Sequence, residues 1–242
     1  MKSFALSAIT LALTVGAAQL AHAEVITQWS FNSITPDGAT GTGSALPSVG
    51  AGSLSLIGGV TTPSFNSGVG SSDPAASDNS GLQTTTYGSQ GAGNNSRGIE
   101  VKASSVGFED VVFSYDLRHS NTSSRYELAQ YSLDGVNFID YAVFDSGLGD
   151  TWFNARTIDL SNVAGADDNA NLAFRVVATF APGTSGYLAS DASKTFAGSG
   201  TWRFDMVSVS GTALPVPEPT SAAAALAGLA AIGFLARRRR AA

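Results

Sequence analysis

Short runs in which hydrophobic and polar residues alternate recur along the chain and predict β-strands. Nine such runs are rich in β-branched and aromatic residues and are bounded by Gly, Asn, Asp and Ser, which favour turns. They cover residues 25–31, 53–58, 98–104, 108–117, 125–133, 136–144, 152–160, 171–180 and 201–211. Between residues 24 and 214 no stretch has helical periodicity, so the pattern predicts an all-β domain.

Two local features refine this prediction. In the last run, Trp202 and Phe204 alternate with polar residues, and the alternation changes phase at Met206-Val207, which predicts a β-bulge. Asp134-Gly135 separates two runs and has the residues of a type I′ hairpin turn, in which both central residues take positive φ. We therefore expect the runs on either side to form an antiparallel pair.

The region from Gly59 to Arg97 is rich in Gly, Ser, Thr and Asn and has the weakest pattern. A structureless loop of this length is unusual in a compact domain, so we expect one or two further strands there, around Leu82 to Tyr87. Their number stays open. Short strands without helical spacers predict a two-sheet antiparallel β-sandwich, jelly-roll-like, for residues 24–214.

The first residues have the features of an export signal. Lys2 is followed by an apolar stretch at 4–15 and by Ala21-His22-Ala23, which fits the small-x-small site of signal peptidase. We expect residues 1–23 to be a signal peptide with a short signal helix, cleaved before Glu24.

Three features follow one another near the C-terminal end of the sequence. Pro217-Glu218-Pro219 comes first, and an uncharged apolar run at 221–236 comes next. Four arginines follow it: Arg237, Arg238, Arg239 and Arg240. The run can enter a bilayer only as a helix that satisfies its own backbone, although it is shorter than the roughly 20 residues of a usual transmembrane helix. The arginines are expected to stay in the cytoplasm.

The sequence VPEPTSAAAALAGLAAIGFLARRRR resembles the PEP-CTERM sorting signal of Gram-negative bacteria, a family of tails processed by a membrane protease called exosortase. The resemblance covers residues 215–242. It implies an exosortase-type protease as partner, transient anchoring in the inner membrane by the C-terminal helix, and a later place on the cell surface or outside the cell. An ordinary C-terminal anchor after a Pro-Glu-Pro turn is the alternative.

A second resemblance concerns the domain in front of this tail. The segments YSLDGVNF, RTIDLSNVAGADDNANLAFRVVATF and TWRFDMVSVSG are similar to the jelly-roll ectodomains often found before PEP-CTERM tails. This resemblance covers the second half of the domain and implies a fold more than an activity.

Composition excludes several classes of function. Residues from Glu24 to Glu218 contain 19 acidic residues against eight basic ones, a net charge of about −11, which repels phosphate backbones. We therefore expect no nucleic-acid partner. The chain has no cysteine, which excludes disulfides, thiolate metal sites and cysteine nucleophiles.

The sequence offers little catalytic chemistry. His119 is the one histidine that remains after the predicted cleavage, and no G-x-S-x-G motif occurs. In the sequence LRHSNTSS, His119 is expected to be a solvated loop residue. The carboxylates Glu100, Glu109, Asp110 and Glu127 lie in predicted strands, where we expect exposed charges and not a catalytic pair. The sequence thus predicts that the protein is not an enzyme and has no catalytic residues or cofactor-binding residues.

The candidate metal ligands are Asp167, Asp168 and Asn169, which supply three consecutive oxygen-bearing side chains of the kind calcium prefers. A solvated turn is the alternative for this loop, and for the second acidic turn from Asp145 to Asp150. The tryptophans at 29, 152 and 202 lie among apolar neighbours, so core packing is expected, with a sugar-stacking surface as the alternative.

Two functional hypotheses of different class follow. The first is an exported, non-enzymatic cell-surface or extracellular-matrix protein, associated through its sorting signal with exopolysaccharide, biofilm or other surface proteins. The alternative is a carbohydrate-binding or carbohydrate-active jelly-roll module, whose dependence on calcium stays open. The glycan, the oligomeric state and the final destination stay open.

Overall fold

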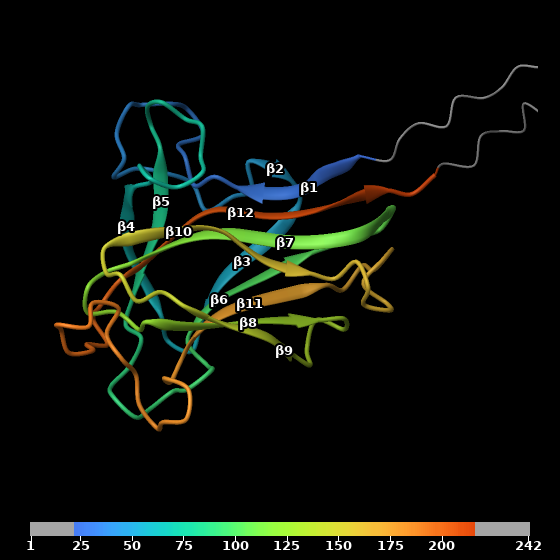
Figure 1. The fold of residues 1–242 in the computed structure, drawn as a ribbon. Coiled ribbons are helices and arrows are strands. Elements are labelled where there is room, and N and C mark those ends of the chain that lie inside the picture. The colour runs from blue at the N-terminus through green and yellow to red at the C-terminus, as the bar shows by residue number, and fades with distance from the viewer. Residues whose placement is uncertain (1–21, 216–242) are drawn as a thin grey trace, which may run out of the picture.

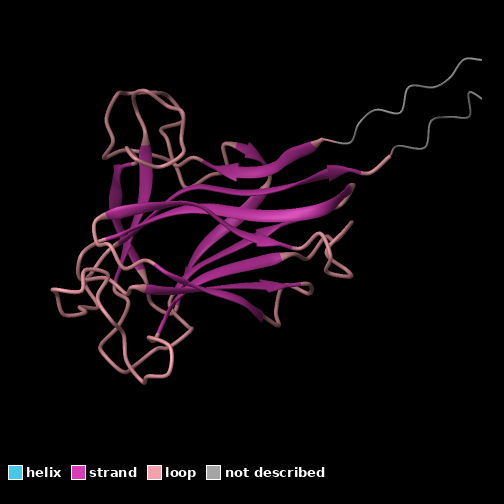
Figure 2. Cartoon of the chain, viewed as in Figure 1, coloured by secondary structure: helices cyan, strands magenta, loops and turns pink. Residues whose placement is uncertain are grey.

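The computed structural model describes residues 22–215, which form twelve β-strands and no helix (Figure 2). The strands are β1 (Ala23–Trp29), β2 (Val49–Gly50), β3 (Gly52–Ile57), β4 (Thr61–Ser67), β5 (Ser80–Thr85), β6 (Gly98–Ala103), β7 (Phe108–His119), β8 (Tyr126–Ser132), β9 (Ile139–Asp145), β10 (Thr151–Asp159), β11 (Ala173–Thr179) and β12 (Trp202–Ala213). Within this range no helix is long and apolar enough to cross a membrane. The predicted signal helix and C-terminal helix lie outside the described residues.

The strands form two antiparallel sheets that face each other (Figure 1). Sheet A has seven strands in the order β10-β7-β12-β1-β2, with β5 also paired to β12 and β4 paired to β5. Sheet B has five strands in the order β3-β6-β11-β8-β9. The prediction of an all-β, two-sheet antiparallel sandwich is confirmed.

Each of the nine predicted strands is present in the fold. The poorly patterned region from residue 59 to 97 contains β4 and β5, so two further strands lie there, as expected. The two-residue strand β2 was not predicted, because a single pair of bridges to β1 leaves no periodic pattern.

Aromatic side chains from both sheets fill the space between them. Phe113 of β7 and Phe174 of β11 stack across the interface with ring centroids 4.6 Å apart. Trp202 and Phe204 of β12 are fully buried in the same core. Sheet-to-sheet packing of this kind removes apolar area from water, which is the main stabilising contribution to a domain without disulfides.

β12 contains the predicted bulge. Met206 has φ +45°, and the register against β7 shifts between Asp205 and Ser208. The bulge changes the phase of the strand, so Trp202 and Phe204 before it and Val207 after it all point into the core.

The connection between β8 and β9 differs in detail from the prediction. The two strands are antiparallel partners, which confirms the pairing. Gly135 has φ +73°, but Asp134 is not among the residues with positive φ, so the turn is not type I′. Instead, the carboxylate of Asp134 accepts hydrogen bonds from the backbone N–H groups of Val136 and Asn137, at 2.9 and 2.7 Å.

The first and last strands are neighbours. β1 pairs with β12 from Ala23↔Thr212 to Trp29↔Val207, so the start of β1 and the end of β12 lie together at one end of the sandwich (Figure 1). Long loops gather at the opposite end (Figure 2).

Candidate functional site

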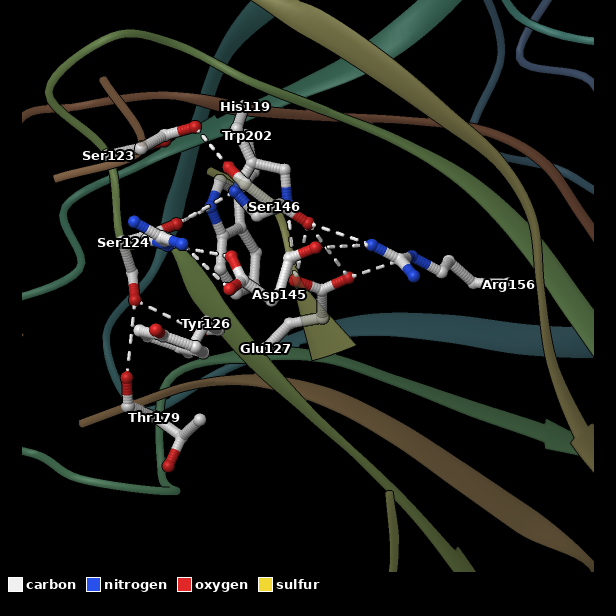
Figure 3. Close-up of polar contacts among 12 residues, drawn as sticks. His119, Ser123, Ser124, Tyr126, Glu127, Asp145, Ser146, Arg156, Thr179 and Trp202 are labelled. Carbon is white, nitrogen blue, oxygen red and sulfur yellow. Dashed lines mark hydrogen bonds and ion pairs between the residues drawn. The ribbon is translucent and has the colours of Figure 1, made fainter. Parts of the chain in front are cut away.

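A polar cluster lies inside the sandwich, and strand register places it at the end away from the start of β1. Figure 3 shows its polar contacts. We call it the interior cluster and define it as His119, Glu127, Ser146 and Arg156. His119 Nε2 is 3.4 Å from Glu127 Oε2, and Arg156 Nε is 3.4 Å from Glu127 Oε1. Ser146 Oγ donates a hydrogen bond to Glu127 Oε2 at 3.0 Å. The side chains of His119 and Glu127 are 0% exposed.

Strand periodicity explains why these two residues point inward. His119 follows Tyr115 and Leu117 at a spacing of two along β7, and Glu127 precedes Ala129 at the same spacing along β8. All of these side chains lie on the core face. The prediction that His119 is a solvated loop residue is wrong, because β7 continues two residues beyond Leu117. The prediction that Glu127 is an exposed charge is wrong for the same geometric reason.

The backbone carbonyl of Ser124 organises the histidine. It accepts hydrogen bonds from His119 Nδ1 at 2.7 Å and from Trp202 Nε1 at 3.1 Å (Figure 3). A carbonyl oxygen only accepts, so Nδ1 carries a proton and Nε2 faces Glu127. Nearby, burial raises the pKa of Tyr115 well above its usual value; the negative charge of Glu127 adds to the rise and Arg156 opposes it.

The enclosure of the interior cluster limits what it can do. A general acid or base must come within hydrogen-bond reach of its substrate. His119 and Glu127 are sealed between the sheets, and Arg156 reaches Glu127 from the edge strand β10 with its own side chain only 20% exposed. The arrangement can hold β7, β8 and β10 in place, and a buried pair of this kind is costly to break from one side.

The other strand carboxylates differ from one another. Glu100 is nearly buried on the outer face of sheet B, where Arg175 Nη2 is 2.6 Å from its Oε2 and Lys102 Nζ is 3.3 Å from its Oε1. The prediction of an exposed charge is therefore wrong for Glu100. Asp110 is exposed, as predicted, and Glu109 is half-buried.

Glu100 belongs to a row of polar residues that crosses sheet B. Cross-strand pairing places Glu100 beside Arg175, Arg175 beside Gln130 and Gln130 beside Asp140. We call these four residues the polar row. The guanidinium of Arg175 also lies over the ring of Phe138, 3.6 Å from its centroid. Lys102, the ion-pair partner of Glu100, also lines a pocket of about 300 Å³ together with Asp134.

The predicted calcium ligands lie together in the loop before β11. Asp167 Oδ1 accepts a hydrogen bond from the Asp110 N–H at 3.1 Å, and Asp168 Oδ1 accepts one from the Gly107 N–H at 2.8 Å. Asn169 Oδ1 accepts a hydrogen bond from the Asn171 N–H at 2.7 Å. In residues 22–215, no three His, Cys, Asp or Glu side chains group together as metal ligands. Calcium at this loop stays a prediction.

The three tryptophans do not share one role. Trp29 and Trp202 are fully buried, which confirms core packing for both. Trp152 is half-buried on β10, and its Nε1 donates a hydrogen bond to the carbonyl of Val69 at 2.9 Å. It fastens a loop to sheet A and is outside the core cluster, so the core prediction is wrong for Trp152.

Sequence reasoning missed a pair of buried aspartates. Asp116 on β7 and Asp205 on β12 are cross-strand partners on the outer face of sheet A, and both are almost fully buried. Burial raises the pKa of Asp205 to about 8, and the charges of Asp73 and Asp116 add to the rise. Both occupy polar positions of strands predicted to face solvent, so no sequence signal marked them as buried.

The predicted sorting residues are not part of the described structure. Ala23, at the predicted cleavage site, is the first residue of β1, whereas Ala21, Pro217, Glu218, Pro219 and Arg237 to Arg240 lie outside residues 22–215. Their assignment depends on the comparison with known families.

Comparison with solved structures gives distant likenesses. One is a Clostridium thermocellum endo-1,4-β-D-xylanase 10B, solved as its CBM22-1 and GH10 modules in complex with xylohexaose: TM-score 0.42, 12% identity, 65% of this chain and 26% of that chain. Another is the K2 cleaved adhesin domain of Lys-gingipain: TM-score 0.34, 12% identity, 78% of this chain and 97% of that chain. The chain thus spans about a quarter of the xylanase structure, and neither likeness bears on function.

No curated protein matches the chain. Among family models, the PEP-CTERM protein-sorting motif matches residues 215–240, the segment that contains Pro217-Glu218-Pro219, the apolar run and the arginines. This is the segment singled out by its three ordered signals, and it follows directly on β12. The chain therefore carries a PEP-CTERM sorting motif behind an all-β domain.

Proposed function

We propose that this protein is an exported, non-enzymatic component of the cell surface or extracellular matrix, sorted through its C-terminal signal. The observation that carries the proposal is the PEP-CTERM motif at residues 215–240, which implies export, transient membrane anchoring and processing by exosortase. The proposed organisation is a signal peptide at 1–23, an exported sandwich at 24–214 and a sorting segment at 215–242. Matrix exopolysaccharide, as in a biofilm, and other surface proteins are the proposed partners.

Each part of the tail has a separate physical task in this proposal. The apolar run at 221–236 enters the inner membrane as a helix, and Arg237 to Arg240 oppose its complete translocation, because arginine is costly to move through hydrocarbon. The prolines of Pro217-Glu218-Pro219 lack backbone donors and favour an extended segment that a protease can grip.

The order of the strands supports a jelly roll as the architecture of the exported domain. β1, β6, β7, β8, β9, β10, β11 and β12 alternate between the two sheets, apart from the β8–β9 hairpin. Each sheet therefore interleaves strands from distant parts of the sequence, as two Greek keys do. β3 extends sheet B at its edge, and β2, β4 and β5 extend sheet A.

The sealed interior cluster supports a role without catalysis. His119, the histidine within the sandwich, is enclosed with Glu127, and Glu100 is held by Arg175 and Lys102. These groups stabilise strands in the proposed role and do not contact a substrate.

Two tail variants test the proposed sorting. Replacing Pro217, Glu218 and Pro219 by Ala should leave membrane insertion intact and block processing, so that full-length chain accumulates in the inner-membrane fraction. Replacing Arg237 to Arg240 by Ser should instead abolish retention in the membrane. The measurement is the mature C-terminus by mass spectrometry, combined with fractionation. If the Ala variant has the same mature C-terminus and destination as the parent, the sorting proposal fails and residues 221–236 are a plain anchor.

A second candidate function is glycan binding on the outer face of sheet B. The polar row supports it, because Arg175 is held flat against Phe138 and Asp140 is exposed next to Gln130, to which it is hydrogen-bonded at 2.7 Å. Such fixed polar groups suit the hydroxyl groups of a sugar. A glycan array and a reducing-sugar assay on the parent and on Arg175→Ala, with and without chelator, test it. Arg118→Ala, on sheet A, is the matched control. Equal glycan signals for both variants and the parent would contradict binding at this face.

A further inference from the structure

Asp116 and Asp205 bring two buried carboxyl groups together without a basic partner. They are directly opposite each other on β7 and β12, where like charges are destabilising. Asp116 is 2% exposed and Asp205 is 0% exposed. Throughout residues 22–215, neither carboxylate makes an ion pair with a Lys, Arg or His side chain. All four carboxyl oxygens accept hydrogen bonds, including one from the Ala155 N–H to Asp116 Oδ1 and one from the Met206 N–H to Asp205 Oδ1, both at 2.8 Å, but none of these donors carries a positive charge to balance the pair.

The loop between β4 and β5, residues 68–79, covers the two carboxylates. Ser71 Oγ donates a hydrogen bond to Asp205 Oδ2 at 2.7 Å, and the Ser72 N–H donates one to Asp116 Oδ2. β10 holds the loop from the other side, since Trp152 Nε1 and Asn154 Nδ2 donate to the carbonyls of Val69 and Gly70. The carboxylates thus lie in a walled site formed by three strands and a fixed loop.

A second observation points to a ligand in this site. Asn79 is 5% exposed, and its Oδ1 accepts no hydrogen bond from any of the described residues. A Cβ at Gly68 would collide with both Asn79 Oδ1 and Asp205 Oδ2, so these two oxygens lie close together beside the same residue. A buried amide oxygen without a donor is costly, and here it is aimed at a carboxylate, which has no proton to give when ionised.

We propose that Asp116, Asp205, Asn79 Oδ1 and the adjacent loop oxygens bind a divalent cation, with calcium the best match. All of these donors are oxygens, as hard cations require, and no nitrogen or sulfur ligand is among them. One divalent ion balances the two carboxylate charges and gives Asn79 Oδ1 its partner. Calcium accepts the irregular geometry of side-chain, carbonyl and water oxygens, whereas magnesium requires a nearly ideal octahedron. This site is distinct from the 167–169 loop and does not depend on the sorting proposal.

The test uses the full chain in detergent, stripped of metal with EDTA and then titrated with calcium. At calcium about 100 times the Kd, Tm should rise by about 5–10 °C. Magnesium should have a smaller effect at equal concentration. Sodium chloride at matched ionic strength controls for screening of the acidic domain and should not reproduce the shift.

Variants locate the ion. Asp205→Asn and Asn79→Ala should each weaken calcium binding, measured by calorimetry, by at least roughly tenfold. Asn79→Asp, which keeps an oxygen at the site, should retain binding. Asp168→Asn is the matched control in the other acidic loop and should bind like the parent. The proposal is overturned if the parent shows no calcium-specific shift, if Asp205→Asn keeps the full response, or if Asp168→Asn alone abolishes it.

Discussion

Trp202 of β12 holds β7 and two connecting segments through both its ring and its indole N–H. The side chain is fully buried, its ring contacts Tyr87 and His119, with centroids 4.7 and 5.0 Å apart, and its N–H binds the Ser124 carbonyl. Trp202→Ala removes this packing and leaves a cavity, so we expect unfolding free energy to fall by about 3–5 kcal/mol. Denaturant unfolding of the full chain measures it. Trp152→Ala, at a half-buried position, should cost less, and equal losses would contradict the core assignment.

Asp205 makes the stability of the calcium-free chain depend on pH. Its pKa is raised to about 8 in the folded state, against an ordinary value of 3.8, mainly by burial and further by Asp73 and Asp116. The folded state therefore holds a proton that the unfolded state has lost. In EDTA, we expect the contribution of the protonated Asp205 carboxyl to the free energy of unfolding to be complete below pH 4 and to decline as pH rises through 8. Arg203 lies two residues from Asp205 on the same strand, and burial lowers its pKa to about 10, so it stays charged in this range.

Thermal unfolding in EDTA at several pH values measures this decline. Asp205→Asn removes the titrating group and should flatten the profile between pH 5 and 8, while Asp168→Asn should leave it as in the parent. An unchanged slope in Asp205→Asn would show that another group is responsible.

Individual polar residues were the hardest to place from sequence. His119 could have been recognised as buried, because it continues the inward series Val111, Phe113, Tyr115 and Leu117 at a spacing of two. Asp116 and Asp205 could not, because they occupy the outward positions and are buried only by a loop with no periodic pattern. The PEP-CTERM motif was the easiest feature to recognise, since the order of its parts along the chain is itself the signal.

At the scale of strands, alternation predicted the elements that have one face in the core. β5 shows why alternation fails to predict other strands. Most of its residues are buried between β4 and β12, but Leu82 is the single large apolar side chain among Ser80, Gly81, Leu82, Gln83 and Thr84. A strand buried with small and polar side chains has no alternation to detect. The pairing of β8 with β9 was predicted correctly, but the type of the turn between them was predicted wrongly. The carboxylate of Asp134 accepts backbone hydrogen bonds that a two-residue turn would not need.

This turn still requires Gly135. Its φ of +73° is unfavourable for a β-branched residue, so Gly135→Val should destabilise the chain by about 1–3 kcal/mol. Gly135→Asn is the matched control and should cost less, because asparagine tolerates this conformation. Denaturant midpoints compare the two. A Val variant as stable as the Asn variant would mean that the loop can adopt another backbone.

At the scale of the whole molecule, the last strand completes the sandwich. β12 pairs with β7, β1 and β5 and carries Trp202, Phe204, Val207 and Val209 into the core. A chain that stops after Gly200 should therefore remain unfolded, whereas one that stops after Pro215 should fold. Limited proteolysis compares the two. A protease-resistant fragment from the shorter chain would show that sheet A closes without β12.

The position of β12 also sets an order of events during synthesis. Of the described strands, β12 is made last, although it lies between β7 and β1, and the sorting motif starts two residues after β12 ends. Until β12 is made, the facing edges of β7 and β1 therefore have no partner in sheet A. Closure of sheet A and synthesis of the sorting motif thus fall next to each other in time, so a completed domain and its sorting motif become available together.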